Sequence, residues 1–418
     1  MGQGQARMEA MPMSGAAVQS AGRATTKLIM LGSAVYALPL DLATEEKFRA
    51  LASAYDVYVV AQSGKILPKW FRQHARFYLI PRLPVPGAGF VALQLLSPLI
   101  LVWLIFRHGI DSVLAQSPHE GFSAALVKKF CALCGRSVAF VLESHGDFQK
   151  AQGLVRRLPF QSFFDRLRDG MARLGVAGAD SYRAVSLTTA RQLQDFGAHS
   201  PPHIYPAWMQ LGVFERAGRD NEAMPRGNYI LFAGDISYLK GVDVLLRAFA
   251  LLAREDDEAL LVLAGPTVNS VFMSQMKTFC SEAGIASRAQ FVGKKGIQEL
   301  ASLMANAKVL VLPSRSEAYG RVLVESLAAG TPVICSNVGG MVEIAQDPSY
   351  SSIVLGEDEA ALCTAMTKWL RASDGGGVRY RCRQRAADLF SPEAYLAVLG
   401  QCLREAHSSM SRETRKCV

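Results

Sequence analysis

Two glutamates in one short segment carry the clearest chemistry that this sequence offers. Glu317 and Glu325 are separated by seven residues within the stretch 312–340, LPSRSEAYGRVLVESLAAGTPVICSNVGG. Carboxylates accept hydrogen bonds from hydroxyl groups, so each glutamate can hold one part of a polyhydroxylated ligand. The spacing places one carboxylate in a loop before a helix and the other about two turns further along.

The elements around these glutamates follow from apolar runs and from glycine and proline. The run AKVLVLP (307–313) is rich in Val and Leu and predicts a buried parallel strand. The apolar segment 322–329 predicts a helix, which Gly330 and Pro332 end. The first backbone N–H groups of this helix lack partners within it and can bind a phosphate. They belong to Tyr319, Gly320, Arg321 and Val322.

This combination resembles the donor-binding signature of the family-4 retaining glycosyltransferases. A bare E-x7-E occurs in many helices, but here PS precedes it, a glycine lies within it and AGTPV follows it. The resemblance implies an α/β fold with the GT-B architecture, in which two Rossmann-like parallel-sheet domains face each other across a cleft. It also implies that Glu317 binds sugar hydroxyls, that Glu325 binds the ribose, and that the donor contacts Ala318 and the four residues after it. The alternative is a solvated glutamate pair on an ordinary helix.

A second motif lies upstream, in YILFAGDISYLKGVDVLLRAF (229–249). The pattern predicts a strand over 229–233, ended by Gly234, and an amphipathic helix over 242–252. Lys240 lies at the turn between them, where a lysine can neutralise a diphosphate. A surface lysine is the alternative for this residue taken alone.

One residue of this motif departs from the family pattern. The family carries an arginine where this chain has Asp235, and a carboxylate repels a diphosphate. Three interpretations are open. Another cation, of which Arg321 is the best candidate, replaces the arginine; Asp235 binds the sugar while catalysis is weaker; or activity is lost.

Two further segments are expected near the same ligand. The resemblance implies that the loop after the strand AQFVG borders the nucleotide base, which places Lys294 and Lys295 there. A solvated basic pair is an equally good interpretation of these lysines. Gly339 and Gly340 resemble the paired glycines of the family and predict a turn near the site.

The first half of the chain contributes one candidate residue. Strands are predicted over 28–35, 55–64, 76–81, 111–117 and 137–144. Helical stretches between most of them predict a parallel sheet. His145 follows the last of these strands, at the edge where open α/β sheets bind ligands. The sequence HGDF resembles the active-site histidine of the family's acceptor domain, which contacts the donor sugar. The alternative is a histidine that caps a loop.

The length of 418 residues suits two domains. We expect a disordered tail over 1–26, an acceptor-binding domain over 27–215, a linker over 216–228, a nucleotide-sugar-binding domain over 229–390 and a C-terminal helix over 391–418 that crosses back to the first domain. The tail lacks periodicity and also lacks the apolar core of a secretory signal. The linker is predicted from its polar composition.

Composition narrows the chemistry. Half of the residues are apolar, so large cores can form without disulfides. The eight cysteines show no disulfide framework or zinc spacing, and Cys131 and Cys134 are interpreted as buried thiols. We therefore expect a cytoplasmic protein with no cofactor and no metal. The net charge of +9 is compatible with a nucleotide donor or a membrane surface. The dispersed basic residues and the lack of a reading motif argue against nucleic acid.

Two segments bear on the membrane. The stretch 88–106 holds 19 residues without a charge, which approaches the length of a spanning helix. Pro98 within it and the predicted strand after it favour a helix packed on the first domain, with one face open to lipid. In the segment 156–175, arginines alternate with Phe and Leu at helical spacing, as in helices that lie on anionic membranes. A solvated basic face is an equally good interpretation.

We therefore expect transfer of a sugar from a nucleotide-sugar donor to a saccharide or lipid-linked acceptor, with retention at the anomeric carbon, in polysaccharide or glycoconjugate biosynthesis. The catalytic residues would be His145, Glu317 and Lys240. Lys240, Arg321 and the helix N-terminus would stabilise the leaving diphosphate. Peripheral contact with the inner face of the cytoplasmic membrane is part of this expectation.

Other classes make different demands on the sequence. A non-catalytic or impaired nucleotide-sugar-binding protein on the same fold is the main alternative, because of Asp235. A GT-B epimerase needs acid–base groups in the cleft, where only His145 and Asp147 present themselves. A dehydrogenase needs a G-x-G-x-x-G loop after the first strand, which this chain lacks.

Overall fold

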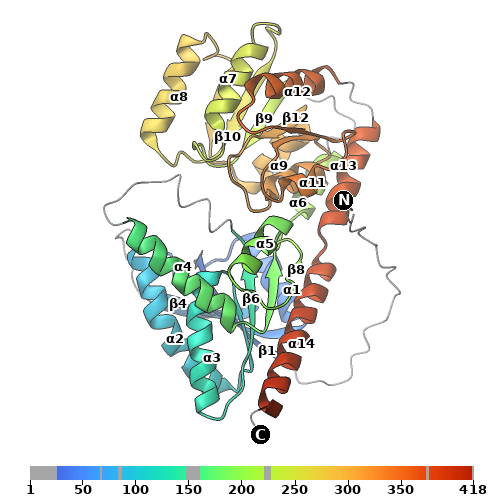
Figure 1. Ribbon diagram of the computed structural model, residues 1–418. Coiled ribbons are helices and arrows are strands. Elements are labelled where there is room, and N and C mark those ends of the chain that lie inside the picture. Colours follow the sequence, from blue (N-terminus) through green and yellow to red (C-terminus); the bar gives the residue numbers. More distant parts are fainter. Residues whose placement is uncertain are drawn as a thin grey trace, which may run out of the picture.

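Two domains form the molecule, each built on a mainly parallel sheet, and they lie one above the other in Figure 1. The computed structural model describes residues 26–65, 68–82, 87–146, 161–220, 227–372 and 376–416. Several predictions concern residues outside this set, namely the tail over 1–25, Asp147, the segment 156–160 and the second half of the linker over 221–226.

The first domain is built on a sheet whose described strands have the order β3-β4-β2-β1-β5-β6-β7-β8. They are β1 (Thr26–Tyr36), β2 (Tyr55–Ser63), β3 (Lys69–Gln73), β4 (Ala75–Ile80), β5 (Ser112–Ala115), β6 (Ala139–Ser144), β7 (Ser181–Ala184) and β8 (His203–Ile204). All neighbours pair in parallel except β3 and β4. The five predicted strands are confirmed, with ends shifted by up to two residues.

The prediction of a wholly parallel sheet is wrong at one edge. Strand β3 was not predicted, and it pairs antiparallel with β4. Only His74, in a left-handed conformation with φ 56°, separates the two strands. So short a connection leaves no room for a crossover, and the two strands must therefore form a hairpin.

Helices cover both faces of the first sheet. They are α1 (Leu42–Ala52), α2 (Ala88–His108), α3 (Pro118–Leu133), α4 (Gln161–Gly178) and α5 (Leu187–Asp195). Successive side chains of a strand point to opposite faces, so Leu28 and Met30 of β1 belong to one apolar cluster and Ile29 and Leu31 to another. The second cluster is the one that α2, α3 and α4 complete.

The second domain holds a sheet of the order β11-β10-β9-β12-β13-β14, parallel throughout its described pairs. The strands are β9 (Tyr229–Ala233), β10 (Leu260–Ala264), β11 (Ala289–Gly293), β12 (Val309–Leu312), β13 (Val333–Ser336) and β14 (Ser351–Val354). The helices are α6 (Gly212–Asp220), α7 (Val242–Leu252), α8 (Ser270–Glu282), α9 (Ile297–Asn306), α10 (Arg321–Ala328), α11 (Met341–Ile344), α12 (Glu359–Arg371) and α13 (Gly376–Leu389). The predicted strand 229–233 and helix 242–252 are confirmed at both ends.

Two elements join the domains. Residues 216–220, predicted to begin the linker, form the end of α6, which packs against α9 and α10 of the second domain. The last helix, α14 (Pro392–Lys416), packs against β6 and β7 of the first sheet and runs along the lower domain in Figure 1. On α14, Glu405 bonds His203 at 2.6 Å, and His407 lies 3.0 Å from Ser112.

Helix α2 is long and apolar enough, by length and composition, to cross a membrane; it is the one such helix among the described residues. Strand β4 ends on the side of the sheet where the parallel strands have their carboxyl ends. Strand β5, which pairs with β1, begins on the side where they have their amino ends. The helix between them therefore runs back along the sheet. Its buried side packs on the first domain, as predicted. Near it, Cys131 is buried as expected, but Cys134 is exposed because it lies just beyond the end of α3.

Candidate active site

An ion pair joins the two motifs of the second domain. The Lys240 ammonium lies 2.5 Å from Oε2 of Glu317, and both side chains are partly buried. Lys240 follows β9 and Glu317 follows β12, which are neighbouring strands of the sheet. Because both strands are parallel, the loops after them meet at the same edge, where ligands of this class of sheet bind.

Close backbone contacts fix these loops against each other. A Cβ atom on Gly241 would lie 2.0 Å from the carbonyl oxygen of Pro313, and one on Gly339 would lie 1.6 Å from that of Glu317. Both glycines also have a left-handed backbone. Side chains at these positions would push the Glu317 loop away from Lys240, which explains why glycine occupies both. The predicted turn at Gly339 and Gly340 thus lies directly behind Glu317.

Helix α10 begins beside the ion pair. Its N-cap is Gly320, with φ 95°, and no side chain caps the helix, so its first N–H groups remain open to a ligand. Arg321 is about half-exposed and lies 3.6 Å from Glu325 one turn later. Burial raises the pKa of Glu325, and the nearby Arg321 opposes that shift.

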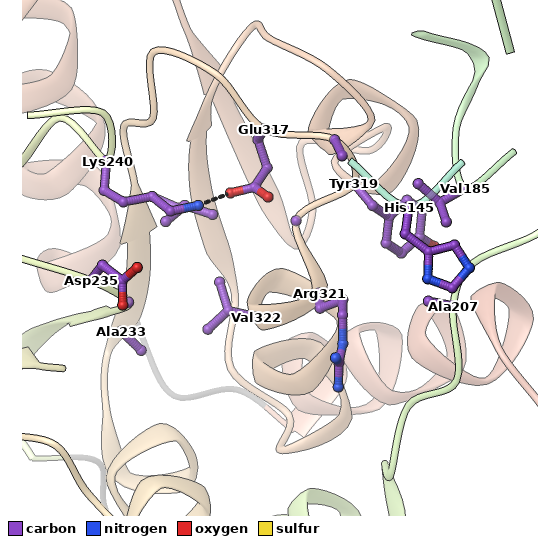
Figure 2. Close-up of a pocket in the computed structure, with 14 residues that line it drawn as sticks. His145, Val185, Ala207, Ala233, Asp235, Lys240, Glu317, Tyr319, Arg321 and Val322 are labelled. Carbon is purple, nitrogen blue, oxygen red and sulfur yellow. Dashed lines mark hydrogen bonds and ion pairs between the residues drawn. The ribbon is translucent and has the colours of Figure 1, made fainter. Parts of the chain in front are cut away.

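These groups line a cavity of about 290 Å³ between the two domains (Figure 2). The second domain contributes Ala233, Gly234, Asp235, Lys240, Leu312 and the run Glu317 to Val322. The first domain contributes His145 and Val185, and Ala207 comes from the segment that leads to α6. In Figure 2 the carboxylate of Glu317 points to Lys240, while His145 lies on the opposite side of the cavity.

A second cavity, of about 380 Å³, adjoins the first. The two share Ala233, Gly234, Asp235, Arg321 and Val322. The second is also lined by Lys294, Lys295 and Glu325. The structure therefore brings every residue predicted for the site to one of two adjacent hollows. It also places Asp235 and Arg321 at the boundary between them.

Three buried groups hold His145 in place. Its Nε2 atom lies 2.8 Å from Glu143, and Glu143 accepts a bond of 2.6 Å from Nε of Arg183. Glu143 and Arg183 are 0% and 1% exposed. The Tyr395 ring of α14 lies 4.8 Å from the guanidinium of Arg183. The histidine is thus fixed by a charged network that spans β6, β7 and α14.

Burial and charge set the protonation of this network. Burial alone would raise the pKa of Glu143, but Arg183 and His145 outweigh it and hold the pKa at about 2. Burial lowers the pKa of His145, and Glu143 only partly offsets that effect. At neutral pH the network is therefore an ionised carboxylate and guanidinium beside a neutral imidazole.

Sequence reasoning missed Glu143 and Arg183. Each is a charged residue in an otherwise apolar strand, AFVLES for β6 and SYRA for β7. A buried charge requires a partner, so these two opposite charges in adjacent strands were a usable signal. Gly265 was missed as well. A Cβ atom there would lie 1.8 Å from the carbonyl oxygen of Gly234, so this glycine sets the shape of the second cavity.

The domains also touch beside the site. The backbone N–H of Leu187, at the start of α5, donates a bond of 2.8 Å to the Glu343 carboxylate of α11. Burial raises the pKa of Glu343, and the bond from Leu187 opposes this. A Cβ atom on Gly340 would lie 2.8 Å from Cβ of Ser186, which shows how closely the two surfaces approach.

Comparison with known proteins identifies the family. Residues 214–388 match the model of "Glycosyl transferases group 1", and residues 44–207 match that of "Glycosyltransferase Family 4". The chain belongs to the group 1, family-4 glycosyltransferases. The two matched regions correspond to the two domains of the structure. The region 214–388 covers the second domain and begins within α6.

Curated relatives of this glycosyltransferase family match over part of their length. The D-inositol 3-phosphate glycosyltransferase of Streptomyces coelicolor is 36% identical over 168 residues, which are 38% of this chain and 37% of that protein. The enzyme of the same description from Acidothermus cellulolyticus is 30% identical over 208 residues, 47% of this chain and 46% of that protein. The chain thus spans less than half the length of the curated relatives it matches.

Solved structures show the fold. Sucrose-phosphate synthase from Thermosynechococcus elongatus has a TM-score of 0.71 and 19% identity, over 92% of this chain and 100% of that chain. Alpha,alpha-trehalose 6-phosphate synthase from Burkholderia multivorans has a TM-score of 0.73 and 13% identity, over 94% and 99%. Both are GT-B proteins, and the predicted GT-B architecture is therefore confirmed.

Proposed function

We propose that this chain transfers a sugar from a nucleotide-sugar donor to a saccharide or lipid-linked acceptor, with retention at the anomeric carbon. One observation carries the proposal. The Lys240–Glu317 pair, the open start of α10 and His145 of the other domain line a single cavity. Family membership supports it, and so does the Anabaena Alr3699/HepE protein, a similar structure solved in complex with UDP and with UDP-glucose.

In this proposal the first task of the site is to stabilise the leaving diphosphate, where negative charge develops. An ammonium has three donors, so Lys240 can keep its bond to Glu317 and also donate to a phosphate oxygen. The N–H groups at the start of α10 supply neutral donors. Arg321, at the boundary of the two cavities, supplies the second cation that offsets Asp235.

The remaining residues orient the donor. Glu317 accepts bonds from sugar hydroxyls, and Glu325, in the adjoining cavity, accepts bonds from the ribose. Lys294 borders the base in the same cavity. Because Nε2 of His145 faces the Glu143 carboxylate, the neutral ring donates from Nε2 and keeps Nδ1 as an acceptor for a sugar hydroxyl.

The covalent step needs no protein nucleophile. The bond from the anomeric carbon to the diphosphate oxygen breaks, and a bond from that carbon to the acceptor oxygen forms on the same face. The acceptor proton passes to the leaving phosphate, so the products are a glycoside and a nucleoside diphosphate. We propose that this proceeds without a metal or cofactor, in the cytoplasm and at the inner face of its membrane, in polysaccharide or glycoconjugate synthesis.

A thermal-shift screen against UDP-, GDP- and ADP-sugars tests the donor site. A ligand that binds only the folded state raises the melting temperature. We expect one nucleotide class to do so, and we expect the shift to disappear in the Lys240→Ala and Glu325→Ala variants. Lys277→Ala is the matched control, since Lys277 is an exposed lysine on α8.

The outcomes separate the possibilities. A shift that survives in both site variants would place the nucleotide elsewhere, and no shift in folded protein would contradict a donor site. Once a donor is known, the anomeric proton of the product, followed by NMR from the start of the reaction, distinguishes retention from inversion.

A second candidate function is that of an impaired or non-catalytic nucleotide-sugar-binding protein. Asp235 favours it, because an exposed carboxylate lines both cavities where the family carries a cation. Replacing it with arginine separates the two functions. If Asp235→Arg raises donor affinity and also creates turnover that the wild type lacks, the chain is an impaired member; if wild type turns over, the enzyme assignment holds.

A further inference from the structure

An apolar stripe runs along the outer side of α2. Leu95, Leu99, Trp103 and Phe106 lie one turn apart, and they are 67%, 68%, 50% and 45% exposed. Of the 18 consecutive residues that make up the most apolar part of this helix, only 28% are buried. The inner side of α2 already packs on the sheet, so the residues of the stripe do not belong to the core of the domain. An exposed apolar surface of this kind indicates an interaction site.

The stripe continues onto neighbouring elements. The α2 and α3 helices pack side by side, and the Arg136 guanidinium after α3 lies 5.5 Å from the Phe106 ring. On α3, Phe130 and Leu133 are 48% and 88% exposed. On the other side of α2, Trp103 contacts the ring of Tyr78 in β4.

A second tryptophan lies beyond Tyr78. Trp70 of the edge strand β3 is paired with Tyr78, so both side chains project from the same face of the sheet as α2. It is 75% exposed. We call the surface formed by Trp70, Leu95, Leu99, Trp103, Phe106, Phe130 and Leu133 the α2–α3 face.

The charges around the α2–α3 face have one predominant sign. Arg72, Arg107 and Lys129 are exposed on β3, α2 and α3. The described residues of α2 and α3 include one acidic side chain, Glu120, and it is 4% exposed. Asp111, which follows α2, is the nearest exposed acid along the chain. Apolar residues with flanking cations and tryptophans are the composition of a surface that lies on an anionic bilayer.

We propose that the α2–α3 face docks this protein onto the surface of an anionic lipid bilayer. The helix α2 would lie in the headgroup region, since its ends are held by β4 and β5 of one sheet and it cannot cross. A second copy of the chain is a poorer occupant. A symmetric dimer through this face would bring the same cations together, and they would repel.

The decisive experiment is sedimentation of the full chain with vesicles of phosphatidylcholine, with or without phosphatidylglycerol. Wild type should pellet with the anionic vesicles and be released by high salt. In Leu95→Glu/Leu99→Glu the bound fraction should fall by about ten-fold, because both side chains would bring a charge into the apolar layer. Leu355→Glu is the matched control, since Leu355 is 65% exposed on the second domain.

A charge-reversal pair tests the electrostatic part. Arg107→Glu/Lys129→Glu should weaken binding to the anionic vesicles, while Arg254→Glu/Lys277→Glu, an equal change on exposed sites of the second domain, should not. Emission of the exposed Trp70 and Trp103 should also shift to shorter wavelength on binding, and Trp70→Phe/Trp103→Phe should remove that shift.

Three results would overturn the proposal. Wild type could fail to pellet with anionic vesicles, or the leucine variant could pellet as wild type does. In the third case, light scattering would show a dimer that dissociates in the leucine variant while no protein binds vesicles, which assigns the face to a second copy. No donor is present in these assays, so their failure is distinct from failure of the proposed transferase activity.

Discussion

The two domains bring charge to the cleft in different ways. In the first, Glu143 and Arg183 are almost wholly buried and bonded to each other, and they fix His145 from behind. In the second, Lys240 and Glu317 remain 23% and 18% exposed and line the cavity themselves. The first arrangement is complete before a ligand arrives, whereas the second has bonding capacity left for one. Buried charges thus fix the position of a site residue, whereas accessible charges are free to bind a ligand.

Removal of one buried charge from the first domain should have the largest effect on stability. Arg183→Met leaves the Glu143 carboxylate buried without its cationic partner and bonded only to the His145 ring, and we expect a loss of about 3–5 kcal/mol in the free energy of unfolding. Urea denaturation measures this. The exposed Arg219→Met variant, whose partner Glu215 lies 3.5 Å away at the surface, should change it little. A loss no larger than that of the control would mean that the network does not hold the first domain.

The accessible pair should show the opposite profile. Lys240→Ala should lower kcat by roughly 10²–10³-fold, the size of effect seen when a donor to developing charge is lost. Its free energy of unfolding should change by about 1 kcal/mol or less, because the pair is partly solvated. Turnover with the donor found by the nucleotide screen and urea denaturation give the two values. Equal loss of stability in this variant and Arg183→Met would erase the distinction between the domains.

Two glycines, one in each domain, differ in how closely other atoms surround them. Gly339→Ala places a methyl group against the Glu317 carbonyl in a left-handed conformation, and we expect a loss of about 1–3 kcal/mol together with weaker donor binding. Gly146→Ala, next to His145, meets no described atom within 4 Å and should be close to neutral. Melting temperature and nucleotide-induced shift distinguish them; equal effects would show that the loop contact does not shape the site.

A fall in pH should cause a smaller loss of folding stability, which comes from His145 in the first domain. The folded pKa of His145 lies below its ordinary value of 6.5, so the neutral ring contributes stability at neutral pH that is lost as pH falls below about 6.5. The pKa of Glu143 is depressed from 4.5 to about 2, so its contribution is lost only below pH 4.5. His145→Gln should therefore lose less stability than wild type between pH 7.5 and pH 5.5, measured by urea midpoints.

The stability change of wild type must be compared with that of the His145→Gln variant, because other histidines also titrate. Burial lowers the pKa of His119 to about 4, so this second histidine also destabilises the fold as pH falls. It is present in both proteins, and its contribution cancels when they are compared. Parallel pH profiles for wild type and His145→Gln would contradict the assignment of a neutral imidazole to this partly buried histidine.

The same two regions differ in how far sequence alone predicts them. On the second domain, Gly234 follows the strand 229–233 and Gly241 precedes the helix 242–252. With local apolar periodicity, these signals predicted both elements with their observed ends. The first domain was harder to predict. Glu143 and Arg183 are 40 residues apart, and only the pairing of β6 with β7 makes them partners. Strand β3 depends on a one-residue turn at His74, and no turn motif in the sequence predicted that turn.

The position of α14 has a consequence for how the protein is made. Tyr395, Cys402 and Glu405 complete the face of the first sheet, so residues near the end of the chain finish the domain that began at β1. A ribosome releases the chain from its N-terminus onward, so the second domain has all its strands outside the exit tunnel before α14 emerges. The first domain to be synthesised is therefore the last to be completed. Until α14 packs on it, one face of its sheet is exposed and is a surface to which a chaperone of nascent chains would bind.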